Sequence, residues 1–166
     1  MDSISNLIGA LLRYWKIHPN KTLMLFKSDV AAAYWRLPLH PLWQIKQIVT
    51  VDGCQHVDRC TSFGGRGSCR DYTAFMGLIL WIAIFIILIA NLFGFINNNF
   101  SFDEEGNILW YQPYQCYYPT KQMKLLKLWD EIYLPHEKSK QEYGPVLRII
   151  EFVVDLNLMC VSMDED

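Results

Sequence analysis

The segment Thr73–Asn99 contains no charged side chain, and this absence constrains the fold more than any other feature of the sequence. Within it, residues 78–92 (LILWIAIFIILIANL) are almost wholly apolar. A run of more than about 18 apolar or neutral residues is long enough to cross a bilayer. The same run also fits a helix buried beneath a sheet and followed by a buried strand. Arg66 and Arg70 precede it and acidic residues follow, which would put its N-terminal side in the cytosol.

Composition bounds the possible classes of protein. A chain of 166 residues with 52% hydrophobic and 19% charged residues is a single folded domain and not a disordered chain. Its net charge is −2 and its pI is about 6.1. Nucleic-acid binding usually depends on a surplus of basic side chains that neutralise phosphates. We therefore expect the isolated chain to bind nucleic acid poorly.

Cysteine and histidine are scattered. The five cysteines form no C-x-x-C pair, so we expect free thiols in a reducing compartment. The four histidines are isolated, with no pair at i,i+4 that could ligate a metal. These residues are Cys54, Cys60, Cys69, Cys116, Cys160, His18, His40, His56 and His136.

The first half of the chain shows several element signals. Residues 3–16 have helical apolar spacing, and residues 22–26 form an apolar strand that leads to Asp29. Residues 44–51 and 54–60 flank Asp52-Gly53, a strong hairpin signal. Residues 63–68 form a glycine-rich loop.

The second half continues the alternation of helices and strands. We expect a helix over residues 71–92, two short strands around an Asn turn over 93–102, and a polar loop at 103–107. A second helix over 119–132, a charged connector at 138–144 and a final strand over 147–154 follow. This order predicts an α+β fold, with an antiparallel sheet and helices packed on one face.

Several motifs occur in a particular order. Asp29 follows a strand and precedes an aromatic residue, Tyr34, by five positions; Leu37–Pro41 comes next. The glycine-rich loop, a helix and then Phe95-Ile96-Asn97-Asn98 follow, with residues 134–138 and 149–155 further on. Together these motifs resemble the palm of reverse transcriptases, most closely those of fungal retroelements, over residues 22–160.

This resemblance implies a fold, a cofactor and partners. The fold would be a polymerase palm, with a ferredoxin-like antiparallel sheet and partial fingers. The ancestral enzyme would use two Mg²⁺ ions, an RNA template and a DNA primer. By resemblance, Asp29 would ligate both metals, the backbone oxygen of Val30 would assist, and Tyr34 would screen the sugar 2′ position. The template and nucleotide loop would comprise Phe63, Gly64, Gly65, Arg66, Gly67 and Ser68.

The sequence departs from this family at two decisive positions. Asn97 and Asn98 stand where the family has two aspartates, so two negative charges are missing from a site that must hold four positive ones. Losing one well-placed electrostatic group commonly costs about 3–4 kcal/mol in catalysis. We therefore predict an inactive polymerase that no longer uses Mg²⁺. Glu151 and Arg70 are further departures from the family pattern.

Less specific interpretations of the same residues stay open. Taken singly, Asp29 would be a capping residue, Tyr34 a core residue, and the glycine loop and residues 97–99 ordinary turns. Two alternative functions also remain: a small single-pass membrane protein with a helix near residues 75–95, and a non-catalytic nucleic-acid-binding module. A cytoplasmic or nuclear location is favoured, with the membrane as the alternative.

The expected organisation follows from the resemblance. Residues 1–21 would be an N-terminal helix left over from the fingers, 22–160 the palm, and 161–166 an acidic tail. A complete thumb and any RNase H or integrase domain are expected to be lacking.

Overall fold

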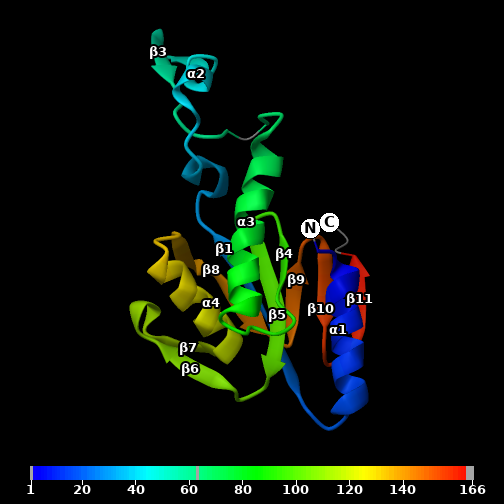
Figure 1. Ribbon diagram of the computed structural model, residues 1–166. Helices are drawn as coiled ribbons and strands as arrows, with labels where there is room; N and C mark the ends of the chain where they lie inside the picture. The colour runs from blue at the N-terminus through cyan, green and yellow to red at the C-terminus, as the bar shows by residue number, and fades with distance from the viewer. Residues whose placement is uncertain (1, 63, 164–166) are drawn as a thin grey trace.

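The centre of the molecule is a four-stranded antiparallel sheet with the strand order β4-β5-β1-β8 (Figure 1). The computed structural model describes residues 2–62 and 64–163. The sheet consists of β1 (Leu23–Val30), β4 (Phe93–Phe95), β5 (Asn98–Glu104) and β8 (His136–Gly144). β1 lies between β5 and β8, and apolar clusters on both faces of the sheet cover its side chains.

The alternation of side chains along β1 divides the interior into two cores. Leu25 and Phe26 are adjacent in the chain and both fully buried, yet they belong to different apolar clusters. Successive strand residues point to opposite faces, so a strand packed on both faces carries apolar residues on each. Lys27 and Asp29 lie on the Leu25 side of the strand, two and four positions further on.

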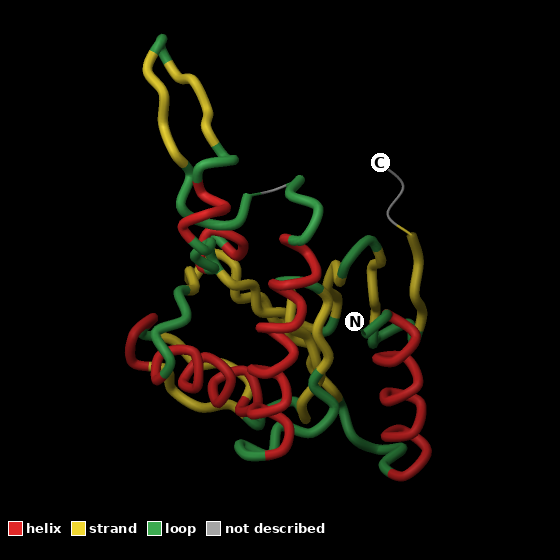
Figure 2. The backbone as a smooth tube through the Cα atoms, turned by 45° about the horizontal axis from the view of Figure 1, so that its top comes forward, coloured by secondary structure: helices red, strands yellow, loops and turns green. Residues whose placement is uncertain are grey.

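Two helices cover the face of the sheet to which Phe26 contributes (Figures 1 and 2). They are α3 (Ser68–Phe85) and α4 (Thr120–Glu131). α3 buries Tyr72, Met76, Ile79 and Ala83, which recur every three or four residues along one side of the helix. Gly94 of β4 permits close packing here, because a Cβ at this position would collide with the Leu80 side chain.

The opposite face of the sheet packs against α1 (Ile4–Ile17) and a separate three-stranded sheet of order β11-β10-β9. The strands of that sheet are β9 (Val146–Ile149), β10 (Phe152–Asp155) and β11 (Cys160–Met163). Leu7 and Leu11 of α1 meet Phe100 and Phe102 of β5 in this second core. Helices therefore lie on both sides of the central sheet, with two on one face and one on the other.

The segment between β1 and α3 begins with η1 (Ala33–Arg36), which buries Ala33 and Tyr34 in the first core. Beyond η1 it projects away from both cores and contains α2 (Pro41–Gln44), β2 (Ile48–Val51) and β3 (Cys54–Val57) (Figures 1 and 2). All residues of β2 and β3 are exposed, and among the residues that the structure describes the two strands pair only with each other. Its turn has positive φ at Asp52 and Gly53, as the Asp-Gly signal predicts.

A second hairpin lies beside α4. It consists of β6 (Ile108–Tyr111) and β7 (Cys116–Pro119), with η2 (Gln112–Tyr114) between the strands. No helix or strand was predicted for these residues from the sequence. Tyr111 and Tyr118 are buried in the first core, whereas Ile108, Leu109 and Trp110 are exposed.

The α+β fold class and its antiparallel sheet are confirmed, but several predicted elements are wrong in detail. α3 ends at Phe85 and not near residue 92, because Leu88 and Asn91 adopt positive φ, which a helix does not allow. Residues 138–144 are not a connector: they lie in β8, paired with β1. The predicted loop at 103–107 begins inside β5, and the single strand at 147–154 is the hairpin of β9 and β10.

The apolar segment forms a helix that is packed on one side. α3 is long and apolar enough to cross a membrane, with a mean hydropathy of 1.3, and 28% of its residues are buried. Its buried side faces the sheet, so this helix does not stand apart from the rest of the fold.

Candidate active site at the ends of β1 and β5

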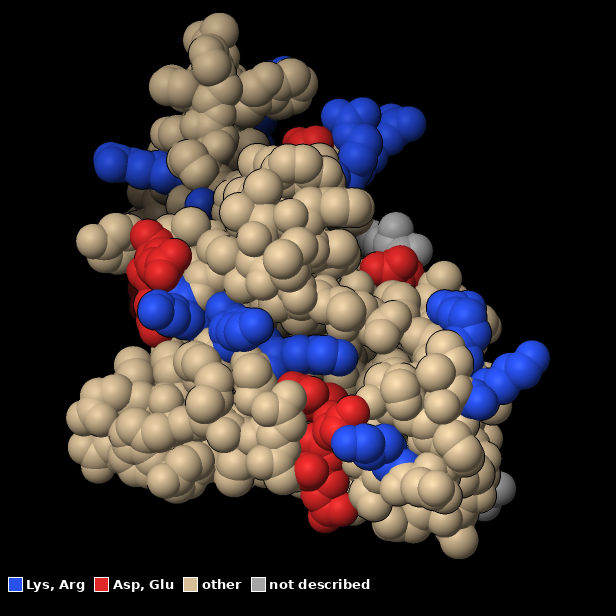
Figure 3. Space-filling model, turned by 60° about the horizontal axis from the view of Figure 1, so that its bottom comes forward, with Lys and Arg blue, Asp and Glu red and all other residues tan. Residues whose placement is uncertain are grey.

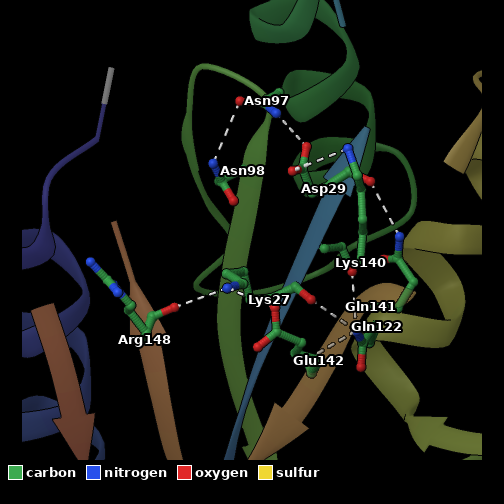
Figure 4. A network of polar contacts seen from close by, with 10 residues as sticks. Lys27, Asp29, Asn97, Asn98, Gln122, Lys140, Gln141, Glu142 and Arg148 are labelled. Carbon is green, nitrogen blue, oxygen red and sulfur yellow. Dashed lines mark hydrogen bonds and ion pairs between the residues drawn. The ribbon is translucent and has the colours of Figure 1, made fainter. Parts of the chain in front are cut away.

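The candidate site lies where β1 ends and the turn between β4 and β5 meets it (Figure 4). Asp29 of β1 is paired across the sheet with Asn98 of β5. Asn97 occupies the turn before Asn98, and its backbone carbonyl accepts a hydrogen bond from Val30 N at 3.3 Å. The expected juxtaposition of the Asn pair and Asp29 is therefore present.

The turn that presents Asn97 is strained. Ile96 has a φ of 55°, in the left-handed region that a β-branched residue strongly disfavours. Its partly buried side chain packs against the first core, and the flanking strands β4 and β5 fix the turn on both sides. Such strained residues persist only where the surroundings hold them, and they concentrate at functional sites.

The Asp29 carboxylate already has two polar neighbours. Its Oδ1 accepts a short hydrogen bond from Asn97 Nδ2, and its Oδ2 lies 3.9 Å from Lys140 Nζ of β8. Burial raises the pKa of the Asp29 carboxyl above its usual value, and Lys140 and the Asn97 amide oppose that shift only in part. The site therefore holds one carboxylate in a setting that disfavours its negative charge.

A second set of polar contacts involves Lys27 and Ser28, which precede Asp29 on β1 (Figure 4). Lys27 Nζ forms an ion pair with Glu142 Oε1 at 2.8 Å and donates to the Arg148 carbonyl at 3.1 Å. On the opposite face, the buried Gln122 side chain donates from Nε2 to Ser28 Oγ at 3.1 Å. It also lies 3.3 Å from the carbonyls of Lys27 and Glu142, so it ties β1 to β8.

These residues do not fit a pair of divalent cations. Mg²⁺ prefers anionic oxygen ligands, and Asp29 supplies the only carboxylate among Asp29, Asn97 and Asn98. The Asn97 amide directs its NH₂ group, a donor, toward the carboxylate. In residues 2–62 and 64–163, no three Cys, His, Asp or Glu side chains gather in a way that could hold a metal ion.

Val30 follows Asp29 directly in the chain, and Tyr34 follows it by five positions. Val30 is fully buried in the first core. Tyr34, in η1, is 7% exposed, and its ring centroid lies 5.2 Å from that of Tyr72 in α3. Burial raises the pKa of both tyrosines, and the charge of Asp29 adds to the effect at Tyr72. The role of Tyr34 as a gate stays a prediction, and its side chain is now a core contact.

The glycine-rich loop leads directly into α3. Gly64 has a φ of 82°, which suits glycine, and Gly67 is the N-cap of α3. A Cβ on Gly65 would collide with the side chain of Ser68, a buried residue in the first turn of α3. Arg66 is exposed, and Phe63 lies outside the described residues. A role of this loop in binding template or nucleotide stays a prediction.

Two residues of β8 that hold Asp29 in place were not predicted from the sequence. Lys140 lies in the segment taken for a connector, and Gln141 beside it donates from Nε2 to the Asp29 carbonyl at 3.2 Å. The alternation of Lys138, Lys140 and Glu142 at every second position was a signal for a strand with one charged face. Gln122 gave no comparable signal, because a lone Gln in a helix is usually exposed.

Comparison with solved structures shows which fold this is. The chain is similar to the foamy viral protease-reverse transcriptase in complex with an RNA/DNA hybrid, with a TM-score of 0.62 and 16% identity over 80% of this chain and 16% of that one. Two further structures of foamy viral protease-reverse transcriptase match similarly. One is in complex with dsDNA, with a TM-score of 0.63 and 15% identity over 85% of this chain and 26% of that one. The other, dRH in complex with ds DNA, has a TM-score of 0.62 and 15% identity over 82% of this chain and 22% of that one.

The similarity extends to the fold and not to the whole of those proteins. The chain spans about a sixth to a quarter of the length of these solved chains. No protein-family model and no curated protein matches the sequence. The molecule has a reverse-transcriptase-like fold, and Asp29 and Asn97 meet at the ends of its central strands.

Proposed function

We propose that this chain is a degenerate reverse-transcriptase palm, derived from a retroelement of the fungal type, that no longer polymerises. The proposal rests on one observation above all. The Asp29 carboxylate is held by the amide of Asn97 and lies 3.9 Å from the ammonium group of Lys140, and neither Asn97 nor Asn98 brings a carboxylate to the site. The fold and the strained turn at Ile96 are what remains of the ancestral site.

The electrostatics of the site support the loss of activity. A nucleotidyl-transfer site of this kind would need clustered negative charge to bring two divalent ions to the primer end and the nucleotide phosphates. Asn97 and Asn98 contribute no charge, and burial disfavours the single charge of Asp29. The remaining contacts hold Asp29 as a structural residue at the end of β1. We propose that Mg²⁺ was the ancestral cofactor and that the present chain uses none.

The ancestral partners would be an RNA template and a DNA primer. The similarity to proteins solved in complex with an RNA/DNA hybrid and with dsDNA supports this proposal for the ancestor. For the present chain, the net charge of −2 argues against strong binding of nucleic acid.

Primer extension tests the proposal. The full chain is incubated with an RNA template, a DNA primer, deoxynucleotides and either Mg²⁺ or Mn²⁺, and we expect no incorporation. Incorporation that disappears in Asp29→Ala would overturn the proposal. Asn97→Asp with Asn98→Asp serves as the comparison variant, because it restores the missing carboxylates without touching the contacts of Gln122.

Decay of the element can be tested separately in the coding DNA. By resemblance, the family has Asp at positions 97 and 98 and Gly where Glu151 stands, and each of these changes corresponds to a single G→A transition. We expect transitions of this type to dominate the divergence from related elements. A predominance of transversions or silent changes would count against decay.

A further inference from the structure

The outer side of α3 carries large apolar side chains where a helix of a folded domain normally carries charged ones. Leu78, Trp81 and Phe85 are 59%, 51% and 61% exposed, and Leu88 just beyond the helix is 74% exposed. They follow one another at helical spacing on the side opposite Tyr72, Met76, Ile79 and Ala83, which pack on the sheet. The core therefore does not account for this apolar side.

A groove beside α3 extends this surface. It has a volume of about 290 Å³ and runs between α3 and the β4–β5 turn. Trp81, Ile84 and Phe85 line it from the helix, and Ile96 lines it from the turn. Asp2 is the one acidic residue that lines the groove. The Asp2 carboxylate accepts a hydrogen bond from the Gly94 N–H at 3.0 Å.

A second exposed apolar surface is formed by the β6–β7 hairpin. Ile108, Leu109, Trp110 and Tyr117 are each more than two fifths exposed. Figure 3 shows uncharged areas on both sides of a row of basic side chains, and acidic side chains at both ends of that row. Exposed apolar areas of this extent on a folded domain usually mark a site of interaction.

The basic row lies over α4 (Figure 3). Lys124 and Lys127 are exposed and three positions apart, so they point to the same side of the helix. Lys121 continues their spacing, but its ammonium group donates to the Phe102 carbonyl at 2.8 Å. The exposed acidic residues of α4, Asp130 and Glu131, lie beyond the C-terminal end of this row.

We propose that this side of the molecule docks onto the surface of an anionic lipid bilayer. Trp81, Phe85 and Leu88 would enter the boundary between headgroups and acyl chains, and Lys124 and Lys127 would contact lipid phosphates. Burial of aromatic and aliphatic side chains together with attraction of lysines to anionic lipids is the usual physics of peripheral membrane binding. The helix would lie along the membrane and keep its contacts with the sheet.

Charge favours this occupant over a second copy of the chain. A two-fold dimer buries the same surface of both subunits, so it would bury two lysine rows in one interface. Anionic headgroups neutralise the row instead. The proposal concerns α3, α4 and the β6–β7 hairpin, and it does not depend on whether the site at Asp29 is active.

Co-sedimentation of the full chain with vesicles tests the proposal. We expect binding to vesicles of phosphatidylcholine with phosphatidylserine, and much weaker binding to vesicles of phosphatidylcholine alone. Lys124→Glu with Lys127→Glu should weaken binding by about tenfold or more, since each lysine near an anionic surface contributes about 1 kcal/mol. Trp81→Ser with Phe85→Ser should abolish it.

A matched control lies on the other side of the central sheet. Lys16→Glu with Ile17→Ser changes one exposed lysine and one exposed apolar residue at the end of α1, and it should leave binding unchanged. Circular dichroism and thermal unfolding confirm that each variant is folded before binding is compared.

Several results would overturn the proposal. Binding to neither kind of vesicle, or equal binding to both, would contradict it. Wild-type chain that resists extraction from the vesicles by carbonate would show insertion instead of docking. Self-association that Trp81→Ser with Phe85→Ser removes, without vesicle binding, would identify a dimer surface, and salt-sensitive RNA binding lost in the lysine variant would identify a nucleic-acid surface.

Discussion

Two regions of the molecule differ in how they are held in place. One is the site at the ends of β1 and β5, and the other is the projecting hairpin of β2 and β3. Asp29 and Asn98 are paired within a sheet whose two faces are covered by separate apolar cores. In β2 and β3 every residue is exposed, and the strands pair only with each other. Both regions lie within the part of the sequence that resembles a reverse transcriptase.

On the proposed ancestry, this difference would account for what is kept when a site loses its charges. The position of Asp29 depends on buried neighbours such as Phe26 and Phe100, which have no part in catalysis, so it persists although Asn97 and Asn98 are uncharged. The hairpin has its Asp52-Gly53 turn, and within the described residues 2–62 and 64–163 its strands pair with no other strand. Its geometry is local, whereas the geometry of the site is set by the whole core.

The largest change in unfolding free energy is expected from a substitution that opens a cavity in the core. Phe26 is fully buried under α3 and α4, so Phe26→Ala should lower the free energy of unfolding by about 3–5 kcal/mol. Urea unfolding followed by circular dichroism measures the change. The matched substitution Ile48→Ala in the exposed hairpin should change it by less than about 0.5 kcal/mol. A comparable loss for both variants would show that the hairpin is held by the core after all.

An intermediate effect is expected where a buried amide ties β1 to β8. Gln122→Ala leaves Ser28 Oγ and the carbonyls of Lys27 and Glu142 without their donor, and unpaired buried polar groups cost about 1–3 kcal/mol. The same unfolding experiment measures it. Gln55→Ala, in the exposed strand β3, is the control and should have almost no effect. A loss of unfolding free energy no larger than that of the control would mean that Gln122 does not hold the strands together.

A smaller effect should appear at Asp29 and depend on pH. Burial raises the pKa of this carboxyl in the folded chain above its usual 3.8, so its ionised form destabilises the fold. The penalty is absent below pH 3.8 and grows as the pH rises through the folded pKa. Asp29→Asn keeps an acceptor for the Asn97 amide and removes the charge. It should therefore unfold at a higher temperature than the wild type at pH 7.

The stability difference between Asp29→Asn and the wild type should itself depend on pH. The advantage of Asp29→Asn should vanish near pH 3, where the wild-type carboxyl is protonated in both states. Asp52→Asn at the exposed hairpin tip should change the unfolding free energy by less than about 0.5 kcal/mol at either pH. An Asp29→Asn variant that is less stable than the wild type at pH 7 would show that Lys140 stabilises the ionised carboxylate more than burial penalises it.

The sequence predicted those parts of the fold whose signals are local. The apolar rhythm of residues 3–16, the Asp-Gly turn and the spacing from Asp29 to the Asn pair each depend on neighbouring residues or on motif order, and the structure contains all three elements. The end of α3 at Phe85 was missed, because residues 86–92 are as apolar as the helix itself and composition cannot mark where the backbone turns.

The partners of Asp29 were missed for a different reason. Lys140 reaches Asp29 only because β8 pairs with β1, a contact between segments far apart in the sequence. Charged residues at 138–142 resembled a solvated connector, although their alternation suits a strand with one exposed face. Likewise, nothing local predicts that Ile96 takes a positive φ, since β-branched residues rarely do so.

Titration of Mn²⁺ into the full chain tests most directly whether the strand ends can still hold catalytic metal ions. We expect the wild type to show no saturable binding in calorimetry, because Asp29 is the one carboxylate among the three site residues and its oxygens face Asn97 and Lys140. Asn97→Asp with Asn98→Asp should acquire binding that Asp29→Ala then removes. Saturable Mn²⁺ binding by the wild type that Asp29→Ala abolishes would contradict this account.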